Sequence, residues 1–205
     1  MNLDDYRTLF VAVSLVLILV STVPVISVVM PRNAEPFFAL GVLGENMMAE
    51  QYYPDDDPNI RNGSLVRWHV GVYNHMGSIQ YVAVRVKLLN STLPSPNSSS
   101  CVPSIVPAFF EFRRVLVKNE TWWFPFYWSI SETDHQGDVI TITEFIVNNV
   151  TLKPDARAVS GFNFRIVLEL WVYNEATGNF EFTWESTQKS SCVWNQIWFN
   201  ATLSE

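Results

Sequence analysis

The chain has 205 residues, a net charge of −7 and only two cysteines. Nucleic acids and anionic lipid surfaces attract basic patches, so this charge balance argues against a nucleic-acid ligand. The chain contains no G-x-S-x-G, no H-E-x-x-H and no glycine-rich phosphate loop, and its three histidines lie in no catalytic motif. We therefore expect a protein that is not an enzyme and that needs no cofactor.

An uncharged apolar segment of 22 residues runs from residue 9 to residue 30. As a helix it would be about 33 Å long, enough to cross the hydrocarbon core of a bilayer. Residues 1–8 contain two acids and one base, the apolar run exceeds that of a cleaved signal peptide, and no Ala-x-Ala follows it. We expect a single-pass transmembrane helix after a short cytoplasmic tail, residues 1–8. Pro24 and the hydroxyl residues near it are compatible with a lone anchor and with packing against other helices.

The orientation of the anchor follows from glycosylation motifs, because Arg7 and Arg32 leave no charge bias across it. Six N-x-Ser/Thr sequons occur, and all of them follow the apolar segment. They begin at Asn62, Asn90, Asn97, Asn119, Asn149 and Asn200. Such sequons are typical of chain that is exported and carries N-linked glycans. The sequence predicts that residues 31–205 form one extracytoplasmic domain on the extracellular side of the plasma membrane.

Alternating apolar and polar residues indicate β-strands throughout residues 31–205. Residues 66–73 and 82–88 alternate clearly, and the polar connection at 74–78 predicts a hairpin between them. A second hairpin is expected where residues 174–179 join two further strands. Other strands are expected at 36–43, 108–117, 122–130, 139–145 and 193–199. Seven to nine strands without a helical period predict an antiparallel β-sandwich of the immunoglobulin or fibronectin kind.

The two cysteines, Cys101 and Cys192, each follow a run of serines, which places them in loops or at strand ends. An isolated pair in an oxidising compartment is expected to form a disulfide. The alternative, a redox or metal-binding thiol, lacks support because neither cysteine has a C-x-x-C partner or a nearby histidine. Residues 89–103 are rich in serine and proline and predict an exposed loop.

Residues 122–128 contain six aromatic side chains in seven positions. A strand buries one face, so we expect one set of alternate residues in the core: Trp122, Phe124, Phe126 and Trp128. Trp123 and Tyr127 then point outward, and Pro125 favours an edge strand. We interpret Trp123 and Tyr127 as a contact for a partner protein or for the membrane interface. Incidental exposure and stacking on carbohydrate are the alternatives.

Two other patterns suggest metal sites and have simpler interpretations. Asp55, Asp57 and Asn59 have the spacing of a calcium loop, but Ile60 and Val66 occupy the glycine and glutamate positions of that motif. A solvated acidic turn explains them, with a weak calcium site as the alternative. His69 and His75 flank a turn, where an Asn-His pair that stabilises the turn explains them better than a metal site.

Two early stretches of the chain resemble a known family. Residues 38–54, FALGVLGENMMAEQYYP, and residues 70–75, VGVYNH, resemble the motifs LG-x-x-G-x-A-x-x-YP and VG-x-x-NH-E of the archaeal membrane-protein family catalogued as domain of unknown function 1616. Residues 150–155 and 167–173 resemble a turn and a strand that come later in that family. Met76 stands where the family has an acid, Asp155 where glycine is common, and the glycine after LG-x-x is missing. The resemblance implies an archaeal source, an immunoglobulin- or fibronectin-like ectodomain and no particular reaction.

The multi-helix part that many members of this family carry would be absent here or supplied by another chain. We therefore expect a non-catalytic accessory or structural subunit that is anchored by residues 9–30. It would bind other membrane or envelope proteins. The alternative is a cell-surface domain that binds carbohydrate or calcium.

Overall fold

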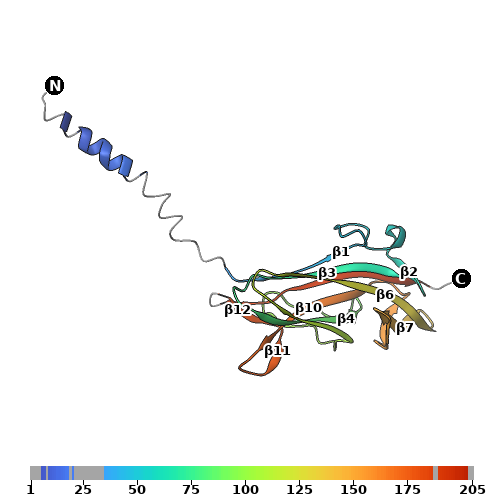
Figure 1. Cartoon of the computed structure of the whole chain (residues 1–205). Coiled ribbons are helices and arrows are strands. Elements are labelled where there is room, and N and C mark those ends of the chain that lie inside the picture. Colours follow the sequence, from blue (N-terminus) through green and yellow to red (C-terminus); the bar gives the residue numbers. More distant parts are fainter. Residues whose placement is uncertain (1–5, 8, 19, 21–34, 187–188, 203–205) are drawn as a thin grey trace. The chain divides into compact units, whose positions relative to one another are not determined.

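Figure 1 shows the computed structural model of the chain, which describes residues 6–7, 9–18, 20, 35–186 and 189–202. The chain divides into two compact units, residues 1–35 and residues 36–205. The described residues of the first unit that precede residue 21 are helical. None of the helices formed by described residues has the length and apolar character required to span a bilayer. Residues 21–30 of the expected transmembrane segment lie outside the described residues.

The second unit is built almost entirely from strands, as the alternation predicts. Its elements are β1 (Phe38–Leu43), η1 (Pro54–Asp56), β2 (Asn59–Arg61), β3 (Val66–Asn74), β4 (Gln80–Leu89), β5 (Phe110–Leu116), β6 (Thr121–Gln136), β7 (Val139–Val147), β8 (Val150–Leu152), β9 (Ala156–Val159), β10 (Phe164–Asn174), β11 (Asn179–Glu181), β12 (Trp184–Ser186), β13 (Lys189–Ser191) and β14 (Trp194–Thr202). The expected strands are all present, and several strands of three or four residues join them.

Two sheets form a sandwich. The first sheet has the order β1-β3-β6-β7-β8, with β9 also paired to β7, and the second has the order β2-β14-β10-β4-β5, with β11 on the end of β10. Their pairs are antiparallel except for the short parallel pair of β2 with β14. The prediction of an all-β antiparallel sandwich is confirmed except at this parallel pair.

Aromatic side chains from both sheets meet in the core. Trp128 of β6 lies 4.9 Å from Phe199 of β14, and Phe124 of β6 lies 4.5 Å from Phe112 of β5, between ring centroids. Trp68 of β3 is fully buried against Trp128. Contacts of this kind between facing sheets hold the two layers together, because each buried aromatic ring removes a large apolar area from water.

The prediction of a hairpin at residues 74–78 is wrong. β3 lies in the first sheet and β4 in the second, so this turn crosses between the layers. The side chain of Asn74 is fully buried there and donates to the backbone carbonyls of Ser78, Leu116 and Val117. These bonds fix the crossing. Of the Asn-His pair expected to stabilise the turn, Asn74 makes these bonds, whereas His75 contacts Tyr73 and Asn119. The second expected hairpin, β10 to β11, is present.

Strand β6 is an edge strand over only part of its length. It pairs with β3 from Thr121 to Trp128, whereas its ladder with β7 begins at Trp128. The side chain of Asn148 covers part of the open side. It accepts from the Tyr127 amide at 2.8 Å and donates to the Pro125 carbonyl at 2.9 Å. The edge position inferred from Pro125 is therefore correct for this half of β6.

Cys101 and Cys192 form a disulfide, with 5.6 Å between their Cα atoms, and this prediction is confirmed. The bond ties the loop between β4 and β5 to the segment that precedes β14. Arg165 of β10 also holds this loop to the second sheet. Its guanidinium donates to the carbonyl of Leu93 and to Gln196 of β14. Burial lowers the pKa of this guanidinium from its ordinary value.

Candidate functional site

The outer side of the first sheet carries the aromatic residues that the sequence predicts to point outward. We call this surface the Trp123 face and define it by the outward residues of β1, β3 and β6: Gly41, His69, Gly71, Tyr73, Trp123, Pro125 and Tyr127. Trp123 is 43% exposed, whereas Trp128 and its three alternate partners on β6 are buried. The alternation inferred from the sequence is confirmed.

Glycine makes room for the Trp123 ring. Gly71 lies opposite Trp123 in the ladder, and a Cβ atom at Gly71 would lie 2.5 Å from the ring. The indole therefore rests directly on the backbone of β3 and offers its other side to solvent. Gly41 pairs with Gly71 and has open space where its Cβ would be. The result is a flat area next to one fixed aromatic ring.

Tyr127 lies farther along the same strand and is partly buried. Its ring packs edge to face on His69, with 6.4 Å between centroids. His69 Nδ1 contacts the carbonyl of Gly44 at 3.2 Å. His75 lies beyond the opposite end of β3, so the two histidines have separate partners and do not converge.

The six sequon asparagines divide into two groups of three. Asn97, Asn119 and Asn149 are exposed, and no described residue accepts a hydrogen bond from their Nδ2 atoms. The amide nitrogens of the other three donate to neighbouring groups: Asn62 to Thr133, Asn90 to the Arg157 carbonyl and Asn200 to Asn59. N-glycosylation uses Nδ2, so the first group has the better geometry for it.

The acidic run forms a local turn. Oδ1 of Asp57 accepts from the backbone amide of Asn59 at 2.9 Å and from its side chain at 2.7 Å. Asp55 has a positive φ of 55° within the short helix η1. Among the residues that the structure describes, no three His, Cys, Asp or Glu side chains converge as a metal site.

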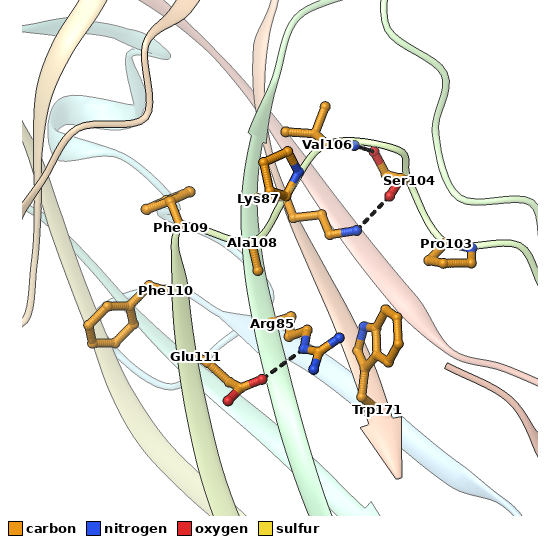
Figure 2. Close-up of a pocket in the computed structure, with 11 residues that line it drawn as sticks. Arg85, Lys87, Pro103, Ser104, Val106, Ala108, Phe109, Phe110, Glu111 and Trp171 are labelled. Carbon is orange, nitrogen blue, oxygen red and sulfur yellow. Dashed lines mark hydrogen bonds and ion pairs between the residues drawn. The ribbon is translucent and has the colours of Figure 1, made fainter. Parts of the chain in front are cut away.

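A pocket of about 700 Å³ lies on the outer side of the second sheet (Figure 2). Its floor comes from Arg85 and Lys87 of β4 and Trp171 of β10, and its walls come from Glu111 of β5 and the loop before β5. No motif in the sequence predicts this pocket. Charges alternating along β4 were visible, but only strand pairing brings them beside β10 and β5.

A buried ion pair supports the pocket. Lys87 Nζ lies 2.8 Å from Glu169, and both side chains are almost inaccessible to water. Lys87 also donates to the Ser104 carbonyl at 2.7 Å, while Glu169 accepts from the Ser104 amide and from the Trp171 indole. A buried charge is tolerated when its partners are satisfied in this way. The pair therefore fixes the loop at Ser104 over the sheet.

Arg85 is the most exposed of the charged side chains that line the pocket. Its guanidinium stacks 3.9 Å from the centre of the Trp171 ring, and its Nε donates to Glu111 at 2.7 Å. Burial tends to raise the pKa of Glu111, but hydrogen bonds from Arg85 and Arg113 outweigh burial and lower the pKa below its usual value. A planar cation, a carboxylate and an aromatic ring thus stand side by side at the opening.

Comparisons with known proteins identify no family. No protein-family model matches the chain, and no curated protein matches it. One similar solved structure is the CARDB domain of a Pyrococcus furiosus protein in complex with di-metal ions. That match has a TM-score of 0.38 and 12% identity, and it covers 83% of this chain and 96% of that one.

A second similar structure is a beta-glucosidase from Listeria innocua in complex with gluconolactone. It has a TM-score of 0.34 and 8% identity, and the match covers 82% of this chain but only 17% of the glucosidase. Neither comparison extends the assignment beyond the all-β fold described above.

Proposed function

We propose that the chain is a non-catalytic accessory or structural subunit of an archaeal plasma membrane. Residues 9–30 anchor it, residues 31–205 lie on the extracellular side, and other membrane or envelope proteins bind its Trp123 face. The uncharged length of residues 9–30 and the six sequons support the anchor and the orientation. The resemblance to the archaeal family of unknown function 1616 supports the source. The disulfide is consistent with an oxidising compartment.

The exposed ring of Trp123 is the observation that carries the partner contact. A large aromatic ring fixed in one orientation loses little freedom on binding, and tryptophan and tyrosine are enriched where interfaces are strongest. The two glycines beside it leave the sheet flat, so a partner can approach closely. Tyr127 extends the same surface along β6.

Replacing Trp123 and Tyr127 together by serine is expected to dissociate the native complex and leave the fold intact. Each buried aromatic anchor contributes about 1.5–3 kcal/mol to an interface. Full-length protein is purified from its own membranes in mild detergent, and its mass is measured by gel filtration with light scattering. Wild-type protein should run with additional subunits and the variant without them. The melting temperature of residues 36–205 should change little.

The matched control replaces Val159 and Phe162 by serine, since both are exposed apolar residues outside the Trp123 face. This control should keep the complex. If wild-type protein carries no other subunit, the accessory role is wrong. If the Trp123 and Tyr127 variant keeps all its subunits, the partner binds elsewhere.

The pocket on the second sheet favours a second candidate function, the binding of carbohydrate. Arg85 and Glu111 present a donor and an acceptor next to each other beside the Trp171 ring, an arrangement that suits hydroxyl or carboxylate groups on a sugar. In this function the domain would hold a soluble or wall-bound glycan.

Titration calorimetry of residues 36–205 with neutral and uronic-acid disaccharides tests the second candidate. Arg85→Met should weaken binding at least about tenfold, because a hydrogen bond to a charged group contributes about 1.5–3 kcal/mol. Arg113→Met is the control, since Arg113 also contacts Glu111 but does not line the pocket. Equal binding by both variants, or no binding by wild-type protein, contradicts this function.

A further inference from the structure

Asn119 lies in a tight turn between β5 and β6, beside three exposed or partly exposed rings. We call these rings, Phe37, Tyr73 and His75, the aromatic cluster. Phe37 lies 4.9 Å from His75 and 5.9 Å from Tyr73, and Tyr73 stacks on His75 at 5.7 Å, between centroids. Phe37 is 43% exposed, and Tyr73 and His75 are partly buried. The cluster thus presents apolar ring surface to solvent next to a sequon.

The turn that carries Asn119 is held rigidly. The backbone amide of Asn119 donates to the Asn74 carbonyl at 2.8 Å, and the buried Asn74 side chain donates to the carbonyls of Leu116 and Val117. Asn119 itself has a φ of 61°, a conformation that asparagine tolerates better than most residues. The direction of its Cα–Cβ bond is therefore fixed by the fold.

One atom of the Asn119 amide is engaged and the other is free. Oδ1 lies 3.0 Å from His75 Nδ1, which is also 3.1 Å from the Tyr73 hydroxyl. An amide oxygen only accepts, so a hydrogen bond between these two atoms requires the proton on Nδ1. Among the described residues, none accepts a hydrogen bond from Nδ2. The amide nitrogen is thus held beside the aromatic cluster and remains available.

We infer that Asn119 carries an N-linked glycan whose first sugar packs on the aromatic cluster. In the reaction, Nδ2 attacks the anomeric carbon of a lipid-linked oligosaccharide. A C–N bond forms, the bond from that carbon to the lipid phosphate oxygen breaks, the phosphate leaves with the electron pair and Nδ2 releases a proton. The C–H face of the sugar then covers ring surface that is otherwise exposed. This inference rests on the extracellular orientation in the proposed function.

The other two available sequons lack such neighbours. Asn97 uses its Oδ1 to accept from the amides of Ser99 and Ser100, and Asn149 lies in the turn before β8. Among the described residues, no hydrogen bond joins either side chain to an aromatic side chain. The three sites are thus matched in exposure and differ in what surrounds them. A glycan at Asn119 should stabilise the fold, whereas a glycan at Asn149 should leave its stability unchanged.

The first experiment is glycopeptide mass spectrometry on the full chain purified from its native host. We expect sugar on Asn119, Asn97 and Asn149, and much lower occupancy on the three asparagines whose Nδ2 atoms are engaged. Sugar on Asn97 or Asn149 but not on Asn119 overturns the inference and leaves the extracellular orientation standing. Absence of sugar at all six sites overturns the orientation.

The second experiment compares melting temperatures of the glycosylated chain. Asn119→Gln should lower the transition by about 2–4 °C, the size expected when a domain of this length loses one modest contact, while Asn149→Gln should leave it unchanged. Phe37→Ser should lower it more in the glycosylated protein than in the Asn119→Gln background, because the sugar and the ring then stabilise each other. Equal effects of the two Gln variants, or of Phe37→Ser in both backgrounds, show that the sugar does not pack on the cluster.

Discussion

Replacing Phe124 and Phe126 by serine is expected to abolish the cooperative folding of residues 36–205. Phe126 is fully buried and Phe124 is 6% exposed, and both rings pack between the sheets. Truncating one buried phenylalanine costs about 3–5 kcal/mol, and a buried serine hydroxyl without a partner adds to this. Two such changes approach or exceed the total stability of an ordinary domain, about 5–15 kcal/mol.

Thermal unfolding followed by near-ultraviolet circular dichroism measures this effect. The Phe124 and Phe126 double variant should lack the tertiary signal of the buried tryptophans. The Trp123 and Tyr127 double variant should retain it, because these two positions lie on the other face of the same strand. A normal melting transition in the Phe124 and Phe126 variant would mean that these rings do not hold the sheets together.

Replacing Cys101 and Cys192 by serine is the change with the next largest expected effect. The two cysteines are 91 residues apart in the sequence, and opening a loop of that length removes on the order of 4–5 kcal/mol of stability in the chain-entropy description. For a domain of this size, that corresponds to a fall in melting temperature on the order of 10 °C or more. Chemical denaturation of residues 36–205 gives the free energy directly.

The matched control is wild-type domain that is reduced by dithiothreitol under denaturing conditions and refolded in reductant. It should lose the same free energy of unfolding as the variant. The variant should still fold, because Arg165 and the Lys87–Glu169 pair hold the same loop to the second sheet by other contacts. A change of less than about 1 kcal/mol would mean that the unfolded chain is already compact around this loop.

Local patterns explain which parts of the fold are readable from the sequence. The alternate burial along β6 follows from the period of a strand, so the exposure of Trp123 and the burial of Phe126 need no knowledge of neighbours. The disulfide follows from there being a single pair of cysteines. In both cases the deciding information lies in the residues themselves.

Pairing between distant strands explains what the sequence does not reveal. The turn at residues 74–78 has the composition of a hairpin, yet Asn74 carries the chain from one sheet to the other by bonds to Leu116 and Val117, more than forty residues away. The pocket around Arg85 likewise forms only when β10 and β5 lie on either side of β4. No spacing rule within one strand identifies either feature.

The open half of β6 limits how another chain can attach to this domain. An exposed strand side normally invites a further strand, because its amides and carbonyls lack partners. Here Pro125 has no amide hydrogen to offer, and Asn148 already occupies the carbonyl of Pro125 and the amide of Tyr127. Addition of a strand along this side is therefore blocked at its centre. A molecule that recognises this side of the domain must therefore contact side chains. Single substitutions of those side chains can then change which molecule binds. The same block disfavours the stacking of many copies into a continuous sheet.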